Sequence, residues 1–207
     1  MRRLLGTCLG LGTLFLLGSE GAASAADTIS PATLTNLQTA FNGESNAHAR
    51  YLAFARKADE ESYSGVASLF RAAARAEEIH AANHSAVIRK SGATPEAKIE
   101  SPIVKSTAEN LRAAVAGESY ERDEMYPGFI SQAREAGEQD AVRTFTFAQV
   151  AEAGHARLYT DALLNLENRR VAQTFYVCPV CGFTAAKLDF KNCPTCATPA
   201  EKYEQVS

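Results

Sequence analysis

Four helical stretches of this chain each place a glutamate on the face that should be buried. Between Ser30 and about Asn168 the sequence is poor in Pro and Gly, and its apolar residues recur at three-to-four-residue spacing, which predicts amphipathic helices. The glutamates that share the apolar phase are Glu44 in the first helix, Glu77 in the second, Glu118 and Glu121 in the third, and Glu152 in the fourth. An uncompensated buried carboxylate is strongly destabilising, so the fold has to bring positive charge to this position.

The ends of the first two helices can be located from their boundary residues. Ser30 and Pro31 are typical of an N-cap and a first helical position. A break at 62–65 separates the first helix from the second, which is expected to end at Ser91 and Gly92. This short break predicts that the first two helices are antiparallel neighbours.

A longer connection separates the second helix from the third. Residues 93–105 contain proline, and Ser106 and Glu109 then form a capping box that opens the third helix. Pro127 can kink this helix, and Gly137 separates it from the fourth. Two short turns and one long middle link are the arrangement of a ferritin-like four-helix bundle. We therefore predict a mainly α fold of this kind.

Two of the inward-facing glutamates are followed three residues later by histidine. Glu77 pairs in this way with His80, and Glu152 pairs with His155; residues at this spacing project from one face of a helix. A lone pair is usually a solvated surface feature, but two pairs with glutamates on both other helices match the ligand pattern of di-iron carboxylate bundles. Carboxylate and imidazole suit iron or manganese. The sequence thus predicts a two-metal site with seven ligands: Glu44, Glu77, His80, Glu118, Glu121, Glu152 and His155.

A separate module of about 35 residues follows at 171–207. Its aromatic residues lie among Cys, Pro and Gly without helical period, and a unit this small needs a staple. Two Cys-x-x-Cys knuckles supply four cysteines: Cys178, Cys181, Cys193 and Cys196. Such knuckles converge on one tetrahedral iron or zinc ion, and two disulfides are the alternative. Zinc would only hold the fold, whereas iron could carry an electron; the neighbouring redox-type site favours iron.

The first 25 residues have the pattern of a cleaved secretory signal. Arg2 and Arg3 precede a short apolar run at 4–17, and small residues at 23–25 offer a cleavage site. The run is shorter than the roughly 20 residues needed to cross a bilayer. We therefore expect export to the periplasm, by the Sec or the twin-arginine route, and a soluble mature protein whose bundle occupies 26–170.

Charge excludes two classes of partner. The net charge of the 207-residue chain is −3, and no basic block interrupts the mixed charges. A nucleic-acid surface or a polybasic membrane anchor would need such a block. The expected partners are therefore small molecules and proteins.

Both halves together resemble the rubrerythrin family over essentially the whole expected mature chain. The residues that carry the resemblance are Gly43-Glu44-Ser45 with Tyr51, Glu77-x-x-His80-Ala81, Gly117-Glu118 with Glu121 and Tyr126-Pro127, Glu152-x-x-His155-Ala156, and, beside a rubredoxin-like pair of knuckles, Lys202-Tyr203-Glu204. The ligand roles that the resemblance implies are bridging Glu77 and Glu152, terminal Glu44 and Glu118, His155 on one iron, and Glu121 and His80 exchanging on the other. One departure is Ala197, because free-standing rubredoxins usually have Gly after the last cysteine.

The resemblance also implies an activity. It is that of a peroxidase whose two ferrous ions reduce hydrogen peroxide to water, with electrons returning one at a time through the four-thiolate iron across a homodimer. Tyr51 and Tyr126 fall at family positions, where each can hydrogen-bond a ligand carboxylate or donate a proton to peroxide; simple packing is the alternative. Two other functions stay open, a ferroxidase or iron-handling protein and a non-enzymatic protein stapled by zinc.

The expected electron donor is a redox protein that the sequence does not identify. Most of the family resembles cytoplasmic proteins, for which NAD(P)H-linked reductases are available donors. Export would separate this chain from them. Export and an NAD(P)H-linked donor are therefore alternatives to be tested together.

Overall fold

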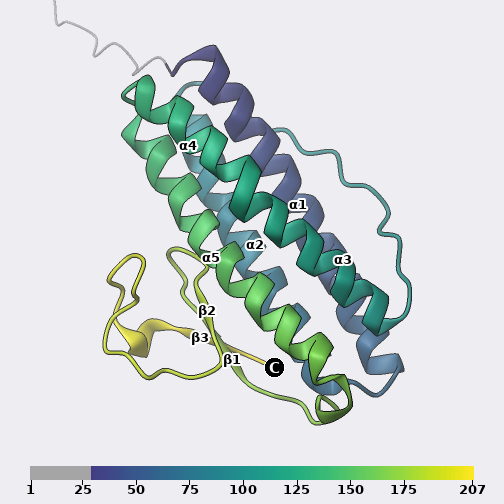
Figure 1. Ribbon diagram of the computed structural model, residues 1–207. Helices are drawn as coiled ribbons and strands as arrows, with labels where there is room; N and C mark the ends of the chain where they lie inside the picture. Colours follow the sequence, from purple (N-terminus) through teal and green to yellow (C-terminus); the bar gives the residue numbers. More distant parts are fainter. Residues whose placement is uncertain (1–28) are drawn as a thin grey trace, which may run out of the picture.

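The computed structural model describes residues 29–207 as a four-helix bundle with a small β module against one side (Figure 1). The helices of the bundle are α1 (Pro31–Glu60), α2 (Ser64–Lys90), α3 (Thr107–Tyr120), α4 (Tyr126–Glu135) and α5 (Gln139–Leu164). The predicted signal segment lies outside the described residues. None of the helices within 29–207 is both long and apolar enough to cross a membrane. The mainly helical, ferritin-like fold is confirmed.

Local signals start the helices where the sequence predicts. The Ser30 hydroxyl accepts a hydrogen bond from the Thr33 backbone N–H at 3.2 Å, so it caps α1. Ser106 and Glu109 form the complete capping box at the start of α3. Gly137, with φ of 76°, occupies the left-handed conformation between α4 and α5.

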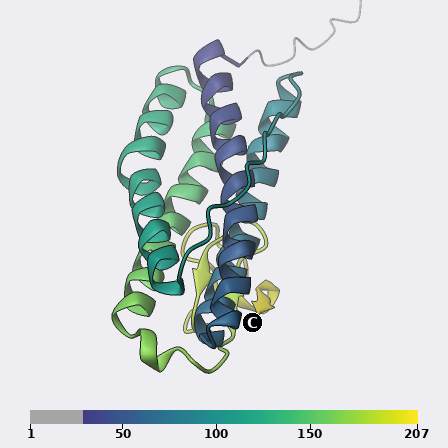
Figure 2. The same cartoon turned by 90° about the vertical axis from the view of Figure 1, so that its right-hand side faces the viewer.

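The long link between α2 and α3 runs along the outside of the bundle (Figure 2). Three amide side chains of α1, spaced four residues apart, hold its backbone: Gln38, Asn42 and Asn46. They accept hydrogen bonds at 2.8–3.1 Å from backbone N–H groups between residues 96 and 100. This spacing places all three on one stripe of α1, so the link is fixed against the helix over two turns.

The third helix of the prediction is interrupted by a single π-helical turn, Glu121–Met125, rather than only kinked. The Tyr126 N–H bonds to the Glu121 carbonyl, five residues back. Pro127 has no N–H to continue the regular ladder, and the wider turn absorbs this break before α4 begins. Such turns recur at functional sites, and this one carries a predicted ligand.

Two apolar clusters fill the bundle and leave its middle to polar groups. One cluster lies toward the α1–α2 turn and contains Phe54, Phe70 and Tyr159. The other lies toward the opposite end and contains Leu37 and Phe145. The buried glutamates and histidines lie between these clusters, where apolar packing on both sides excludes water.

The C-terminal module is a three-stranded antiparallel sheet in the order β2–β1–β3, formed by β1 (Phe175–Val177), β2 (Thr184–Ala185) and β3 (Glu204–Val206). One 3-10 turn, Leu166–Asn168, precedes the sheet, and another, Ala200–Lys202, lies between β2 and β3. Phe175 and Val177 of β1 belong to the apolar core of the bundle. At the edge, Arg75 of α2 makes a two-pronged ion pair with Glu204, at 2.6 and 2.9 Å. The module is therefore docked on its own bundle.

Candidate metal centre

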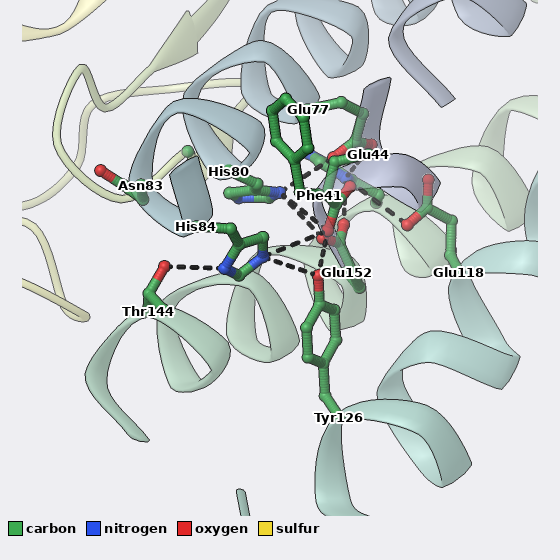
Figure 3. Close-up of polar contacts among 12 residues, drawn as sticks. Phe41, Glu44, Glu77, His80, Asn83, His84, Glu118, Tyr126, Thr144 and Glu152 are labelled. Atoms are coloured by element: carbon green, nitrogen blue, oxygen red, sulfur yellow. Dashed lines mark hydrogen bonds and ion pairs between the residues drawn. The ribbon is translucent and has the colours of Figure 1, made fainter. Parts of the chain in front are cut away.

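Six of the seven predicted bundle ligands meet in the middle of the four helices. Figure 3 labels all of them except His155. The six form two donor groups, and within each group the ligand atoms lie within 4.8 Å of one another. The first group consists of Glu44, Glu77, His80 and Glu152. The second consists of Glu77, Glu118, Glu152 and His155. All six side chains are buried. Because Glu77 and Glu152 belong to both groups, the arrangement provides two adjacent metal positions that share two carboxylates.

The carboxylates of this cluster leave oxygens that a metal would satisfy. One oxygen of each makes no hydrogen bond among the described residues: Glu44 Oε2, Glu77 Oε1, Glu118 Oε2 and Glu152 Oε1. A histidine nitrogen lies within ion-pair distance of the last three, whereas Glu44 Oε2 has no such neighbour among these residues. Buried unpaired acceptors are rare and destabilising. Their convergence in a dry core is the arrangement that divalent cations stabilise, so the residues present fit a two-metal site.

The two histidines turn the same ring nitrogen toward the carboxylates. His80 Nδ1 lies 2.9 Å from Glu77 Oε2 and 3.0 Å from Glu152 Oε1, and His155 Nδ1 lies 2.8 Å from Glu152 Oε2. Burial, reinforced by the charge of Glu77, raises the pKa of Glu152 well above its ordinary value. Burial lowers the pKa of His80, but the charge of Glu152 and the hydrogen bonds to Glu152, Glu44 and Glu77 together outweigh it and raise that pKa. A cation at this position would therefore compete with protons for these groups.

The C-terminal module contacts the back of both histidines. His80 Nε2 lies 3.2 Å from the Cys181 carbonyl oxygen, and His155 Nε2 lies 3.0 Å from the Thr184 hydroxyl. A hydrogen bond from Nε2–H leaves the Nδ1 lone pair facing the carboxylates, which is how metal-binding histidines are commonly oriented. Thr184 was not predicted from the sequence, because nothing in its spacing links it to a residue 29 positions earlier.

Gly182 makes the contact with His80 possible. A Cβ at this position would lie 2.2 Å from His80 Nε2, and its φ of 74° is in the left-handed region. Any side chain would therefore both clash and strain the backbone. The knuckle that carries Cys181 can approach the bundle this closely because glycine follows it.

Both predicted tyrosines hydrogen-bond a carboxylate of the cluster. Tyr51 donates to Glu118 Oε1 at 2.5 Å, and Tyr126 donates to Glu44 Oε1. His84 is fully buried behind Tyr126, with Nε2 3.1 Å from the tyrosine oxygen. His48 of α1 has a different partner: its Nδ1 lies 2.7 Å from the Ala74 carbonyl oxygen.

Glu121 is the one predicted ligand outside both donor groups. It lies on the π-helical turn and is half-buried. Burial raises the pKa of its carboxyl well above the ordinary value, and the charges of Glu44 and Glu118 raise it further. Glu121 is therefore within electrostatic reach of the cluster without belonging to it.

The four cysteines form a second site, and all four are free thiols. The sulfurs of Cys178 and Cys196 and those of Cys181 and Cys193 lie 3.5 Å apart. A tetrahedral site with metal–sulfur distances of about 2.3 Å places sulfurs about 3.8 Å apart, far longer than the roughly 2.05 Å of a disulfide. The arrangement fits one four-coordinate metal ion and does not form the two disulfides considered as the alternative.

The fold and the two sites define a class of protein: a ferritin-like di-iron carboxylate bundle joined to a rubredoxin-like four-cysteine module. A family model described as rubrerythrin matches residues 35–163. The chain belongs to the rubrerythrin family. The family and both donor sets fit two iron ions in the bundle and one iron at the cysteines.

Relatives of known sequence match most of the chain. Nigerythrin of Nitratidesulfovibrio vulgaris is 38% identical over 172 residues, covering 83% of this chain and 85% of the relative. Rubrerythrin-2 of Clostridium acetobutylicum is 37% identical over 172 residues, covering 81% and 93%.

Solved structures show the same relationship. The fully reduced, all-ferrous state of nigerythrin matches with a TM-score of 0.79 and 36% identity, over 88% of this chain and 91% of that one. Mycobacterium tuberculosis bacterioferritin BfrA, at 20% identity and a TM-score of 0.63 over 68% and 89%, shares the bundle fold alone.

Proposed function

We propose that this protein is a peroxidase that reduces hydrogen peroxide to water at the bundle site, with electrons supplied through the four-cysteine iron. The observation that carries the proposal is the contact between the two sites. The Cys181 carbonyl accepts a hydrogen bond from His80 Nε2, and Cys181 is one of the four cysteines. One residue thus belongs to the electron-carrying site and touches a candidate ligand of the reacting site.

The ligand roles in this proposal follow from the donor groups. Glu77 and Glu152 belong to both groups and would be shared by the two metals, with Glu44 and His80 completing one position and Glu118 and His155 the other. By the family resemblance, Glu121 would exchange with His80 when the oxidation state changes. The hydrogen bond from His80 to Cys181 favours the state in which His80 is the ligand. Exchange would therefore break the contact with the module.

The overall reaction consumes two electrons and two protons for each peroxide and yields two water molecules. When bound, the iron pair supplies both electrons together and polarises the peroxide oxygens. The hydroxyls of Tyr51 and Tyr126 hold protons beside the donor groups. Burial raises the pKa of both tyrosines well above the ordinary value, so both hydroxyls stay protonated until peroxide requires a proton.

The module contacts the bundle of its own chain, so the proposed electron route does not require a second subunit. A homodimer remains part of the proposal as the assembly that the resemblance implies. Export through the predicted signal would place the protein in the periplasm. Its donor would then be a redox protein of that compartment rather than an NAD(P)H-linked cytoplasmic reductase.

Stopped-flow mixing of the fully reduced protein with peroxide or with oxygen tests the activity. We expect the bundle irons to be oxidised much faster by peroxide than by oxygen, and the four-cysteine iron to be oxidised afterwards. Oxidation by oxygen at an equal or greater rate would contradict the proposal. Steady turnover of added Fe(II) with retention of the iron would instead indicate a ferroxidase.

A further inference from the structure

His84 is a buried histidine that neither the family motifs nor the two donor groups include. It lies on α2 one turn beyond His80, and its side chain is fully enclosed. Its ring packs against Phe145, with ring centroids 5.4 Å apart. A charged ring would be unfavourable in such surroundings unless it were paired. The contacts of both ring nitrogens therefore have to explain why a histidine occupies this position.

Each nitrogen of His84 has one close polar partner other than Glu44. Nε2 lies 3.1 Å from the Tyr126 hydroxyl, and Nδ1 lies 2.9 Å from the Thr144 hydroxyl of α5. Tyr126 in turn donates to Glu44 Oε1. Figure 3 shows the row from Thr144 through His84 and Tyr126 to Glu44. The row joins helices α5, α2, α4 and α1 by side-chain contacts alone.

The protons of this row can be placed in only one way when the His84 ring is neutral and Glu44, which accepts from Tyr126, is ionised. The single proton of Tyr126 goes to Glu44, so the tyrosine oxygen accepts from His84, and Nε2 carries the hydrogen. Nδ1 is then the acceptor, and the Thr144 hydroxyl donates to it. Every hydrogen bond in the row therefore points from Thr144 toward Glu44.

From this geometry we propose that His84 is a positioning residue that fixes the Tyr126 hydroxyl toward Glu44 Oε1, with Thr144 selecting the required tautomer of His84. This arrangement determines which carboxylate oxygen of Glu44 is available to a metal. Its Oε1 is occupied by Tyr126, whereas its Oε2 has no partner among the described residues. The row thus reserves Oε2 for a metal. This inference rests on the proposed role of Glu44 as a ligand.

The tyrosine at the other metal position has different neighbours. Tyr51 packs among Phe54, Phe70 and Tyr159 with ring centroids 5.5–6.2 Å apart, and the Arg50 guanidinium lies 5.4 Å from its ring centroid. Tyr126 also packs against aromatic rings, with its centroid 6.3 Å from that of Phe129 and 6.0 Å from that of Phe145. The feature particular to Tyr126 is the His84 nitrogen 3.1 Å from its hydroxyl oxygen.

Metal affinity of the full-length protein tests the inference independently of activity. Zinc is kept at the four cysteines, and Mn(II) binding to the metal-depleted bundle is followed by electron paramagnetic resonance. His84→Leu should weaken Mn(II) binding about tenfold, as expected when a partner behind a ligand is lost. His84→Gln, which keeps a donor near the Nε2 position, should stay within about threefold of the original protein.

A double-mutant cycle then distinguishes positioning from general packing. If His84 acts through Tyr126, adding His84→Leu to Tyr126→Phe should cause no further loss of affinity. In the Zn(II)-loaded protein, ¹⁵N NMR should show the Nε2–H tautomer of His84, and Thr144→Val should populate the Nδ1–H tautomer. Additive losses, failure of His84→Gln to restore binding, or an Nδ1–H tautomer in the original protein would each overturn the inference. If these affinities behave as expected but peroxide does not oxidise the reduced protein, the proposed function fails while the positioning role stands.

Discussion

Replacing Gly182 with alanine should separate the two metal sites. The added Cβ would lie 2.2 Å from His80 Nε2 and 2.7 Å from its Cδ2, so the knuckle or the imidazole has to move. Overpacking of this kind destabilises by about 1–3 kcal/mol, and alanine at a φ of 74° adds about 1–2 kcal/mol. We expect a total loss of about 2–5 kcal/mol in the free energy of unfolding.

The chain offers a matched control for this change. Gly154 of α5 also faces the module, but a Cβ there would meet only the Thr184 carbonyl oxygen at 4.0 Å. Gly154→Ala should therefore be tolerated and should stabilise the helix by up to about 1 kcal/mol. Both variants keep all four cysteines and all the predicted bundle ligands.

Two measurements check the effect of Gly182→Ala. Chemical denaturation of the iron-loaded protein gives the change in stability, and stopped-flow spectroscopy gives the rate at which the four-cysteine iron is oxidised after the bundle irons have reacted. We expect both to fall in Gly182→Ala and neither to fall in Gly154→Ala. If Gly182→Ala keeps the stability and the transfer rate of the original protein, the close contact does not form in solution and the reasoning is refuted.

Three further changes have expected outcomes. Glu152→Gln should weaken Mn(II) binding by at least tenfold, because it removes a carboxylate that both donor groups share; binding as tight as in the original protein would contradict the metal assignment. The hydrogen bond from Arg75 lowers the pKa of Glu204. The pair therefore stabilises docking of the module fully at pH values above the ordinary pKa of a glutamate. This stabilisation is lost as the pH falls through the lowered pKa of Glu204. Limited proteolysis of the module should accordingly increase at low pH in the original protein, and Glu204→Gln, at a cost of about 0.5 kcal/mol, should show no such pH dependence. Ala197→Gly should stabilise the module by about 0.5–1 kcal/mol in chemical denaturation, since φ is 62° there; a loss of stability would show that the alanine is unstrained.

Much of the bundle could be predicted because its signals are local. Caps such as Ser30 and Ser106 act within one helical turn, and the i, i+3 spacing of Glu77 and His80 fixes their common face wherever the helix packs. The grouping of six predicted ligands follows from helical phase together with an antiparallel arrangement. These are properties of a few residues at a time, so the linear sequence contains them.

The supports behind the ligands could not be predicted in the same way. His84 meets Thr144, 60 residues later, and His155 meets Thr184 across the interface between bundle and module. No spacing rule connects such pairs, because their distance depends on how the whole module docks. The π-helical turn was missed for a related reason: Pro127 predicts a break in the ladder, but whether a kink or a wider turn absorbs it depends on the neighbouring helices.

The docking of the module changes what the first Cys-x-x-Cys knuckle, with Cys178 and Cys181, contributes to the protein. A four-cysteine module attached by a flexible linker would serve only as an electron carrier. Here the same knuckle supplies the carbonyl that orients His80, and the following strand supplies the hydroxyl that orients His155. Removing the module would expose both Nε2 atoms as well as remove the carrier. In the proposed function, the bundle site and the module would therefore act as one unit, in which docking of the module orients the two histidines of the bundle site.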